Sequence, residues 1–286
     1  MIKGITIFTP TYNRKNYLAR LYDSLIHQKF HDFEWLIVDD GSTDDTSLLI
    51  NDFQHENRIN INYIYQNNAG KHMAFNTGVL YAKYELFMCV DSDDYLVDDV
   101  LEYIYSMWIS VNGKKDNLCG LLAYRGKNPN ETMFGEKFLH PYDFSTVKDE
   151  MKKRMFETTM VHRRDILRQF PFPKFENENF ITEDVIWRQI DQEYVYYIVP
   201  KVWTICSYLP TGLTKSINIF KYPKGEAEYF KVRYKSEHSL INKIKEYAKY
   251  LVFDKTKLPD KYGTILYIPA RILSHLYHYV WKKNFE

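Results

Sequence analysis

The chain has 286 residues, enough for one large domain or for a domain with an extension, and its 38 Lys and Arg balance 37 Asp and Glu. A net charge of +1 gives no electrostatic footprint for a nucleic acid, and no uncharged apolar run approaches the length that spans a bilayer. The three cysteines lie far apart without metal spacing, and a strand-like run begins almost at residue 1 and leaves no room for a signal peptide. We therefore expect a cytoplasmic protein.

Strands and helices alternate over the first 95 residues. Short apolar runs predict strands at 4–9, 33–38, 59–65 and 86–90, and apolar residues at helical spacing predict helices within 17–26, 48–53 and 73–82. This alternation predicts right-handed βαβ units and a parallel sheet. A polar segment follows each strand, at 10–14, 39–42, 67–71 and 91–94. In a parallel sheet these segments meet at one edge, where α/β proteins bind nucleotides.

The pattern changes after residue 95. We expect a helix at 97–108, short helices at 163–170 and 183–190, and strands at 118–124, 156–162, 194–199 and 203–208. Residues 126–150 carry several Gly and Pro residues and predict a long irregular loop. From about 216 onward the chain is helical, basic and aromatic.

The strongest chemical signal is Asp91-Ser92-Asp93-Asp94, directly after a buried strand. Like charges this close repel one another, and a divalent cation such as Mg or Mn removes the repulsion. Such a cation is usually held by one or two carboxylates and by substrate phosphates. The alternative is an acidic turn that caps the next helix. No GxGxxG or GxxxxGK[ST] pattern is present, so phosphate contacts must come from a cation and from side chains.

Five short elements together resemble the GT-A fold of the family 2 glycosyltransferases, which make bacterial surface and capsular polysaccharides. They are Thr-Pro-Thr-Tyr-Asn-Arg at 9–14, Val-Asp-Asp-Gly-Ser-Thr-Asp at 38–44, Asn-Ala-Gly-Lys at 68–71 with Asn76 and Gly78, Asp-Ser-Asp-Asp at 91–94, and Glu183-Asp184. The resemblance implies an α/β GT-A domain over 1–215, with a Rossmann-like nucleotide-sugar half at 1–95 and a mixed-sheet acceptor half at 96–215. Residues 216–286 would form a helical extension outside it.

The resemblance implies a nucleotide-sugar site at the predicted sheet edge. Asp40 would accept a hydrogen bond from the N3–H of uracil, which suits an acceptor-only carboxylate, and Asp39 would orient the loop. Lys71 would reach the diphosphate, and it would replace a contact that relatives often make with an Arg at the position of Phe75. The remaining donor-site residues implied are Thr9, Pro10, Tyr12, Asn67, Asn76, Asp91 and Ser92.

In similar enzymes the second Asp of the D-x-D pair binds the cation. Asp93 would therefore hold Mn or Mg here, with Asp91 on the ribose or on the cation, and the cation would offset charge on the leaving nucleoside diphosphate. Taken without the resemblance, the acidic cluster is equally consistent with a helix cap.

Glu183-Asp184 matches the acidic pair from which the family draws its general base. Asp184 would take the proton of the attacking acceptor hydroxyl, and Glu183 would hold an acceptor hydroxyl. Thr182 would cap the helix and place both carboxylates in its first turn, where the helix dipole favours the ionised form. One base without a second nucleophile implies a single displacement with inversion. Ordinary helix capping is the competing interpretation of these two residues.

Other segments carry weaker expectations. The basic segment His162-Arg163-Arg164 follows a predicted strand, and in similar enzymes a basic pair often lies here. His162 and Arg163 would contact the acceptor or a lipid diphosphate; the alternative is an ordinary surface pair. Residues 208–214 resemble a segment that closes over the donor. Ile265, Ile268, Ile272, Leu276 and Tyr279 recur at helical spacing with basic residues between them. That helix could lie on a membrane surface, pack on the catalytic domain or form a dimer contact.

The sequence therefore predicts a metal-dependent, inverting transferase that moves a sugar from a nucleotide sugar, most simply a UDP-sugar. The acceptor would be a hydroxyl of a cell-surface glycan or of its lipid-linked precursor, on the inner side of the plasma membrane. Two alternatives stay open: a sugar nucleotidyltransferase, and a non-catalytic scaffold that binds a sugar nucleotide.

Overall fold

The computed structural model describes residues 2–135, 142–153, 157–206 and 218–285. Contacts group the chain into two compact units: Met1–Pro171 with Glu193–Tyr208, and Phe172–Gln192 with Leu209–Glu286. The second unit thus takes in residues 172–192, and the domain boundary at 215 stays a prediction. Within the described ranges, no helix combines the length and the hydropathy needed to cross a membrane.

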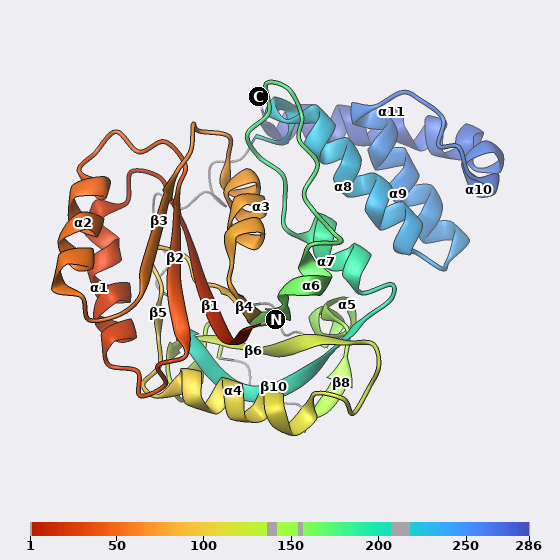
Figure 1. The fold of residues 1–286 in the computed structure, drawn as a ribbon. Coiled ribbons are helices and arrows are strands. Elements are labelled where there is room, and N and C mark those ends of the chain that lie inside the picture. Colours follow the sequence, from red (N-terminus) through yellow and green to blue (C-terminus); the bar gives the residue numbers. More distant parts are fainter. Residues whose placement is uncertain (1, 136–141, 154–156, 207–217, 286) are drawn as a thin grey trace. The chain divides into compact units, whose positions relative to one another are not determined.

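Four parallel strands form the N-terminal half of the sheet of the first unit, in the order β3-β2-β1-β4 (Figure 1). Their bounds are β1 Ile2–Thr11, β2 Phe33–Asp39, β3 Ile61–Tyr65 and β4 Tyr84–Cys89. The connecting helices are α1 Lys15–Ile26, α2 Thr46–Glu56 and α3 Lys71–Tyr81. The alternation read from the sequence is confirmed in this half.

Packing on both faces of these strands explains their continuous apolar character. Leu18, Leu21 and Leu25 repeat along one side of α1 and are fully buried in a core that also holds Ile5 and Ile7 of β1. Figure 1 shows α1 and α2 on one face of the sheet and α3 on the other. The α3 face is filled by Phe8, Phe75 and Phe87, whose rings pack within 6 Å of one another.

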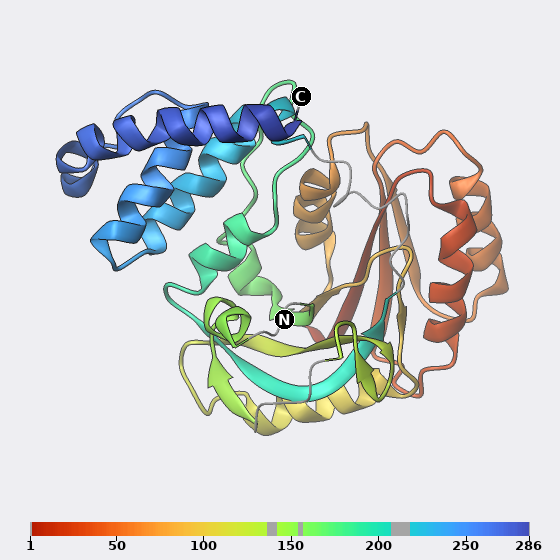
Figure 2. The same ribbon diagram turned by 180° about the vertical axis from the view of Figure 1, so that it is seen from behind.

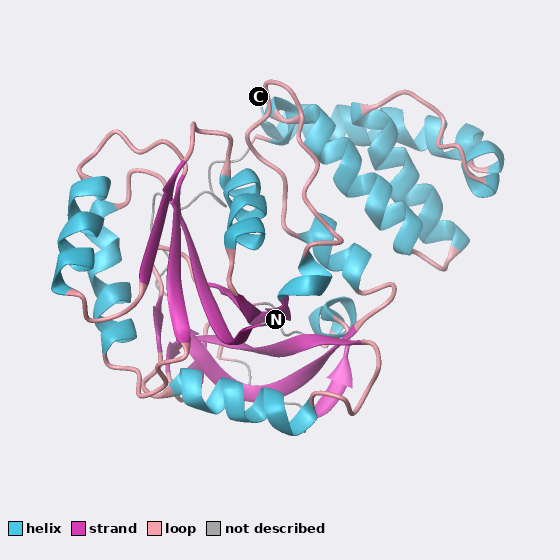
Figure 3. Cartoon of the chain, viewed as in Figure 1, coloured by secondary structure: helices cyan, strands magenta, loops and turns pink. Residues whose placement is uncertain are grey.

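The other half of the sheet is mixed, with the order β4-β9-β6-β10-β5. Figure 3 shows the strands of the sheet in magenta. β9 runs antiparallel to both β4 and β6, and β10 runs parallel to β6. The bounds of the elements in this half are β5 Tyr95–Leu96, α4 Val100–Val111, β6 Leu118–Asn128, β7 Glu131–Thr132, β8 Asp143–Ser145, α5 Val147–Lys152, β9 Thr158–Arg163, α6 Arg164–Leu167 and β10 Val195–Ile205.

Two expectations for this half were wrong. Residues 126–150 are not one irregular loop, because β6 continues to Asn128, β7 and β8 add short strands to the sheet, and α5 begins after a cap by the Thr146 hydroxyl. The two strands expected at 194–199 and 203–208 are one strand, β10. Its pairing with β6 shifts between Ile198 and Val202, so Pro200 lies in an irregularity where its missing N–H breaks no ladder bond.

The second unit is helical. It contains α7 Asp184–Ile190, a 3-10 helix at Ile219–Lys221, α8 Pro223–Ser236, α9 Leu240–Phe253, α10 Lys261–Ile265 and α11 Tyr267–Phe285. Its core is formed by buried residues of α8, α9 and α11, among them Phe230, Tyr234, Tyr247, Leu251 and Ala270. Figure 2 shows α11 lying across α8 and α9. Pro269 lies in the first turn of α11, where a missing N–H costs nothing.

Candidate functional site

Asn13 ties together the two loops that follow β1 and β2. Its side-chain oxygen accepts hydrogen bonds from the backbone N–H groups of Thr43 (2.7 Å) and Asp44 (3.2 Å), and its own N–H donates to the Ser42 hydroxyl. Its positive φ of 54°, which Asn tolerates, allows this position. The loop therefore holds the neighbouring Tyr12 about half exposed, as a ring that stacks on a base must be.

Thr9 and Pro10 are buried and belong to β1, which continues to Thr11. The pairing of β1 with β4 ends at Phe8, so the absent N–H of Pro10 breaks no bond there. The Thr9 hydroxyl accepts from the indole N–H of Trp35 at 3.0 Å. Thr9 and Pro10 therefore anchor the turn to the sheet. Tyr12 is exposed to solvent.

Asp39 and Asp40, at the end of β2, are both buried and both hydrogen-bonded. Asp39 accepts from the Ser42 N–H and from the Tyr63 hydroxyl, each at 2.7 Å. Asp40 accepts from the Gln66 side chain (2.7 Å) and from the backbone N–H groups of Ala69 (2.9 Å) and Gly70 (2.8 Å). Asp40 thus fixes the loop before α3, as Asp39 fixes the loop before α2. A carboxylate has about four lone-pair sites, and the described residues of the chain occupy three of those of Asp40.

Gly70 is the N-cap residue directly before α3 and has a φ of 93°, a conformation that glycine adopts without strain. Lys71 follows it, and its Nζ lies 2.7 Å from Oδ1 of Asp91 in the loop after β4. Asn67 is exposed and Asn76 half-buried, whereas Ser92 is buried. The structure therefore brings the loops after β1, β2, β3 and β4 to one edge, as the sequence predicted.

Arg125 of β6 also reaches this edge. Its Nη1 lies 3.3 Å from Oδ2 of Asp91 and 3.5 Å from Oδ2 of Asp94. Asp93 forms a long ion pair with Arg14 (3.9 Å), and its backbone carbonyl accepts from Arg20. The three carboxylates are therefore balanced by cations from α3, from β6 and from the loop after β1.

Burial and neighbouring charges act differently on the pKa of Asp91, which is half-buried, and on that of Asp94, which is buried. Burial raises the pKa of Asp91, but the charges of Lys71 and Arg125 outweigh it and bring that pKa well below its ordinary value. Asp94 is almost fully buried, and burial raises its pKa to about 7; Arg125 opposes this and the charge of Asp91 adds to it. Asp91 is the carboxylate that this cluster keeps ionised.

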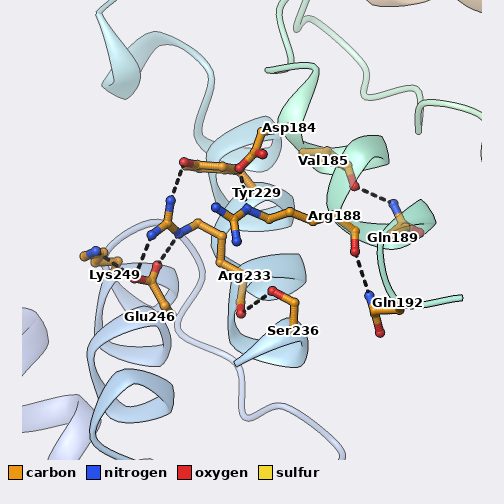
Figure 4. Close-up of polar contacts among 10 residues, drawn as sticks. All are labelled: Asp184, Val185, Arg188, Gln189, Gln192, Tyr229, Arg233, Ser236, Glu246 and Lys249. Carbon is orange, nitrogen blue, oxygen red and sulfur yellow. Dashed lines mark hydrogen bonds and ion pairs between the residues drawn. The ribbon is translucent and has the colours of Figure 1, made fainter. Parts of the chain in front are cut away.

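The predicted base, Asp184, belongs to the second unit. It is the first residue of α7 and forms an ion pair with Arg188, one turn further along the same helix (Figure 4). Tyr229 of α8 has a raised pKa because of burial, and the negative charge of Asp184 contributes to the shift. Asp184 therefore lies in a polar cluster between α7 and α8.

An ion-pair network extends this cluster to α9 (Figure 4). The Tyr229 hydroxyl accepts from Nη1 of Arg233 at 2.7 Å. Arg233 donates through two nitrogens to both oxygens of Glu246, at 2.7 and 3.1 Å, and Lys249 donates to Glu246 at 2.9 Å. Two-point contacts of this kind fix a guanidinium in one plane. The network therefore joins α8 to α9 and is connected through Tyr229 to the cluster that contains Asp184.

The expected cap of α7 was wrong. The helix begins at Asp184 with Glu183 as its N-cap residue, no cap bond from a side chain is present there, and Asp184 is the acidic residue of the first turn. The Thr182 carbonyl accepts from the Val185 N–H, so Thr182 takes part through its backbone. Asp184 therefore lies in the first turn of α7, and Glu183 lies directly before that turn.

Comparison with known proteins identifies the family. The profile described as "Glycosyl transferase family 2" matches residues 6–174. The chain belongs to glycosyl transferase family 2. It is 33% identical over 156 residues to glycosyltransferase GlyA of Streptococcus pneumoniae, and 32% identical over 144 residues to chondroitin synthase of Pasteurella multocida. These alignments cover 54% and 50% of this chain but only 22% and 14% of those proteins.

Solved structures confirm the GT-A-like fold. TarS 1–349 of Staphylococcus aureus, solved in complex with UDP-GlcNAc, superimposes with a TM-score of 0.65 at 17% identity, covering 87% of this chain and 71% of that one. Mannosyltransferase PcManGT of Pyrobaculum calidifontis, with GDP-Man and Mn²⁺, gives a TM-score of 0.58 at 13% identity, covering 99% and 85%. The chain therefore combines a match to the family 2 glycosyltransferase profile with a GT-A-like fold, a combination that favours a glycosyltransferase over the nucleotidyltransferase alternative.

The acidic cluster of this family 2 glycosyltransferase has the composition expected of a site where protein carboxylates and a substrate together bind a cation. Within the described residues, no group of three or more His, Cys, Asp and Glu side chains could hold a metal ion. Asp93 is partly exposed and only loosely paired with Arg14, and Asp91 lies two residues before it. One or two carboxylates completed by phosphate oxygens is the arrangement that Mg and Mn usually adopt.

Of the two residues predicted to contact the acceptor, His162 is buried and Arg163 is half-buried. His162 lies in β9 between β4 and β6, is 3% exposed, and has its Nδ1 3.1 Å from the Tyr196 hydroxyl. Burial lowers the pKa of His162 to about 3, so the ring is neutral. Arg163 is half-buried and donates to Asp165 (2.7 Å) and to the Leu118 carbonyl (3.4 Å). The central position of β9 overrides the surface character that a basic pair suggests.

The sequence missed Arg125 and Arg188. Arg125 is 34 residues from Asp91, and only the pairing of β6 with β9 and of β9 with β4 brings it near. The pairing of Arg188 with Asp184 could have been predicted from the sequence, because an acid and an Arg four residues apart on a helix are neighbours. The segment 208–214, expected to close over the donor, lies outside the described residues.

Proposed function

We propose that this enzyme transfers a sugar from a UDP-sugar, with a bound Mn or Mg ion, to a hydroxyl of a cell-surface glycan or of its lipid-linked precursor. The observation that carries the proposal is the cluster of Asp91, Asp93, Lys71 and Arg125 at the carboxyl end of the parallel strands. UDP is supported by TarS, which was solved with UDP-GlcNAc, and by the carboxylate of Asp40, on which the described residues occupy three of about four lone-pair sites. Mn is supported by PcManGT, which was solved with GDP-Man and Mn²⁺.

We assign the donor to the edge formed by the first four loops. Tyr12 would stack on the base, and Asp40 would accept from its imide N–H. Lys71 would leave its pair with Asp91 and turn to the diphosphate, since its flexible stem carries a compact charge. Asp91 and Asp93 would hold the cation, which when bound neutralises charge on the leaving nucleoside diphosphate.

We assign Asp184 as the general base. Its carboxylate would accept the proton of the acceptor hydroxyl as that oxygen attacks the anomeric carbon, and the nucleoside diphosphate would leave from the opposite face, so the configuration inverts. Arg188 and Tyr229 would hold the carboxylate in place from α7 and α8. Glu183, at the N-cap, would contact the acceptor.

The donor assignment is tested by thermal unfolding with UDP, GDP, CDP and TDP, each with and without Mn²⁺. A ligand at 100 times its dissociation constant stabilises the folded state by about 2.7 kcal/mol, a readily measured shift. We expect the largest shift with UDP and a dependence on Mn²⁺. A preference for another nucleotide would overturn the assignment of uracil to Asp40 and leave the family assignment intact.

The base assignment is tested by Asp184→Asn, which keeps the shape of the side chain and removes its basicity. We expect turnover to fall at least 100-fold with unchanged UDP binding, because general-base catalysis contributes about 10²–10⁴-fold. Asp149→Asn, on the exposed side of α5, is the matched control and should keep normal turnover. Full turnover by Asp184→Asn would show that another group takes the proton.

A further inference from the structure

Helix α11 has two apolar sides, and only one of them is used in the core of its unit. Ala270 and Ser274 are buried, and Leu273, Tyr277 and Trp281 pack against the core formed with α8 and α9. At 3.6 residues per turn these positions share one side of the helix. This side accounts for how α11 is held.

The other side of α11 is an apolar stripe in solvent. Ile268 and Ile272 are each 70% exposed, Leu276 is 58% exposed and Tyr279 is 69% exposed. Spacings of four, four and three residues place them within about 80° of arc, roughly opposite the buried side. Ile265 of α10, 62% exposed, continues the line. Single exposed apolar residues are ordinary, but a contiguous row of five indicates a contact surface.

The charge beside this stripe has one sign. Arg271 and Lys282 lie along one edge of it with His275, and Lys283 lies at its C-terminal end. Helix α11 contains no Asp or Glu, and residues 255–285 contain six Lys and Arg against the single acid Asp260. That acid is turned inward, since it caps α10 and accepts from the Tyr234 hydroxyl.

We propose that the stripe of Ile268, Ile272, Leu276 and Tyr279, with Arg271, Lys282 and Lys283, docks on an anionic lipid bilayer with α11 parallel to its surface. An apolar face bordered by cations is the pattern that lies in the interface of a membrane, with the apolar residues among the acyl chains and the cations at anionic headgroups. The stripe is about 16 Å long at 1.5 Å per residue, and it needs no spanning helix.

Charge argues against a second copy as the occupant. A two-fold contact brings the same face of each protomer together. Two α11 helices would then meet with cations on both sides and no carboxylate of α11 to balance them. An anionic bilayer supplies both the apolar phase and the missing negative charge.

The proposal concerns a surface distinct from the proposed donor site, so the two are tested separately. The full chain is floated with vesicles of phosphatidylcholine alone and with vesicles that contain 30% phosphatidylglycerol, at low and at high salt. We expect enrichment on the anionic vesicles and its loss at high salt, because salt screens the charges. The variant Ile268→Asn/Ile272→Asn/Leu276→Asn should lower vesicle binding at least 100-fold. Lys282→Gln/Lys283→Gln should lower it roughly 30-fold, about fivefold per charge.

The matched control is Leu48→Asn/Leu80→Asn, which changes two equally exposed apolar side chains, 62% and 63%, on α2 and α3. It should bind vesicles as the wild type does. Circular dichroism and the nucleotide-induced thermal shift check that each variant folds and that the donor site is unaffected. Equal binding to neutral and anionic vesicles, or unchanged binding by the stripe variant, would overturn the proposal. So would a dimer in light scattering that the stripe variant abolishes, because a second copy would then cover the face.

Discussion

Lys71 and Asp91 form an ion pair with 2.7 Å between Nζ and Oδ1, and this pair joins the start of α3 to the loop after β4. Both residues belong to segments that the sequence marked for the donor, 20 positions apart in the chain. Because Asp91 is also paired with Arg125, it is not left unbalanced when Lys71 turns to a bound diphosphate.

Lys71→Gln should weaken UDP binding by about 10- to 100-fold, since a hydrogen bond to a charged group contributes about 1.5–3 kcal/mol. Uridine lacks the diphosphate, and its affinity should not change. Isothermal titration with both ligands separates the two contributions. Lys29→Gln, which removes an exposed cation paired with Asp99 on the surface, serves as control. An equal loss for uridine would mean that the variant disturbs the loop and not a phosphate contact.

Arg125→Gln should lower the free energy of unfolding by about 1–3 kcal/mol, because it leaves Asp91 and the almost fully buried Asp94 facing each other without their shared cation. Adding Asp94→Asn removes the buried carboxyl, whose ionised fraction repels Asp91, and should restore part of that loss. Urea unfolding of the two single variants and the double variant gives the coupling energy. Strictly additive effects would contradict a direct interaction between Arg125 and Asp94.

Gly78→Ala should destabilise the protein although it lies within helix α3, where alanine is intrinsically favoured by about 1 kcal/mol. A Cβ at Gly78 would lie 2.5 Å from the ring of Phe8. That ring cannot move aside, because it is fully buried and stacked on Phe87 at 5.2 Å. Overpacking costs about 1–3 kcal/mol, so a net loss is expected in thermal unfolding. Combining Gly78→Ala with Phe8→Leu should recover stability, and no recovery would show that the clash lies elsewhere.

Local periodicity was sufficient for the parallel half of the fold. Leu18, Leu21 and Leu25 repeat at helical spacing, and β2 is apolar because helices cover both of its faces. The same topology placed the polar loops at one edge, so the neighbourhood of Asp40, Lys71 and Asp91 followed from strand order alone. Whether a segment forms a strand or a helix depends on patterns among residues close together in the sequence, and these patterns can be recognised without knowing the fold.

Contacts between strands that lie far apart in the sequence could not be predicted from these local patterns. Arg125 reads as one more charge at the end of a strand, and its place beside Asp91 depends on the register across β9. His162 precedes two arginines and suggests a surface, yet its strand is paired on both sides and covers it. The irregularity at Pro200 likewise depends on a partner strand, so one strand was predicted as two. The roles assigned to Asp93, Asp184 and Glu183 stay predictions, and Asp184→Asn tests the role of Asp184.

Glu226, in the first turn of α8, gives the second unit a specific dependence on pH. The side chain is buried, and burial together with the nearby charge of Glu178 raises its pKa from 4.5 to about 7. Glu178 cannot move away, because it accepts from the backbone N–H groups of Lys224 and Gly225 at 2.8 Å each. Since the folded state holds a proton on Glu226 that the unfolded state releases between pH 4.5 and 7, stability contributed by this group is present below pH 4.5 and is lost as the pH rises through 7.

Glu226→Gln mimics the protonated side chain and should therefore raise the melting temperature at pH 8 by several degrees, which corresponds to roughly 1–3 kcal/mol. The difference from the wild type should shrink as the pH falls and vanish near pH 4.5. Glu228→Gln is the matched control on the same helix; it changes a partly exposed carboxylate paired with Lys231, and its effect should stay within about 0.5 kcal/mol at each pH. A Glu226→Gln variant that is less stable than the wild type at pH 8 would mean that the ionised carboxylate has a partner in the folded protein, and the assigned sign of the pH dependence would be reversed.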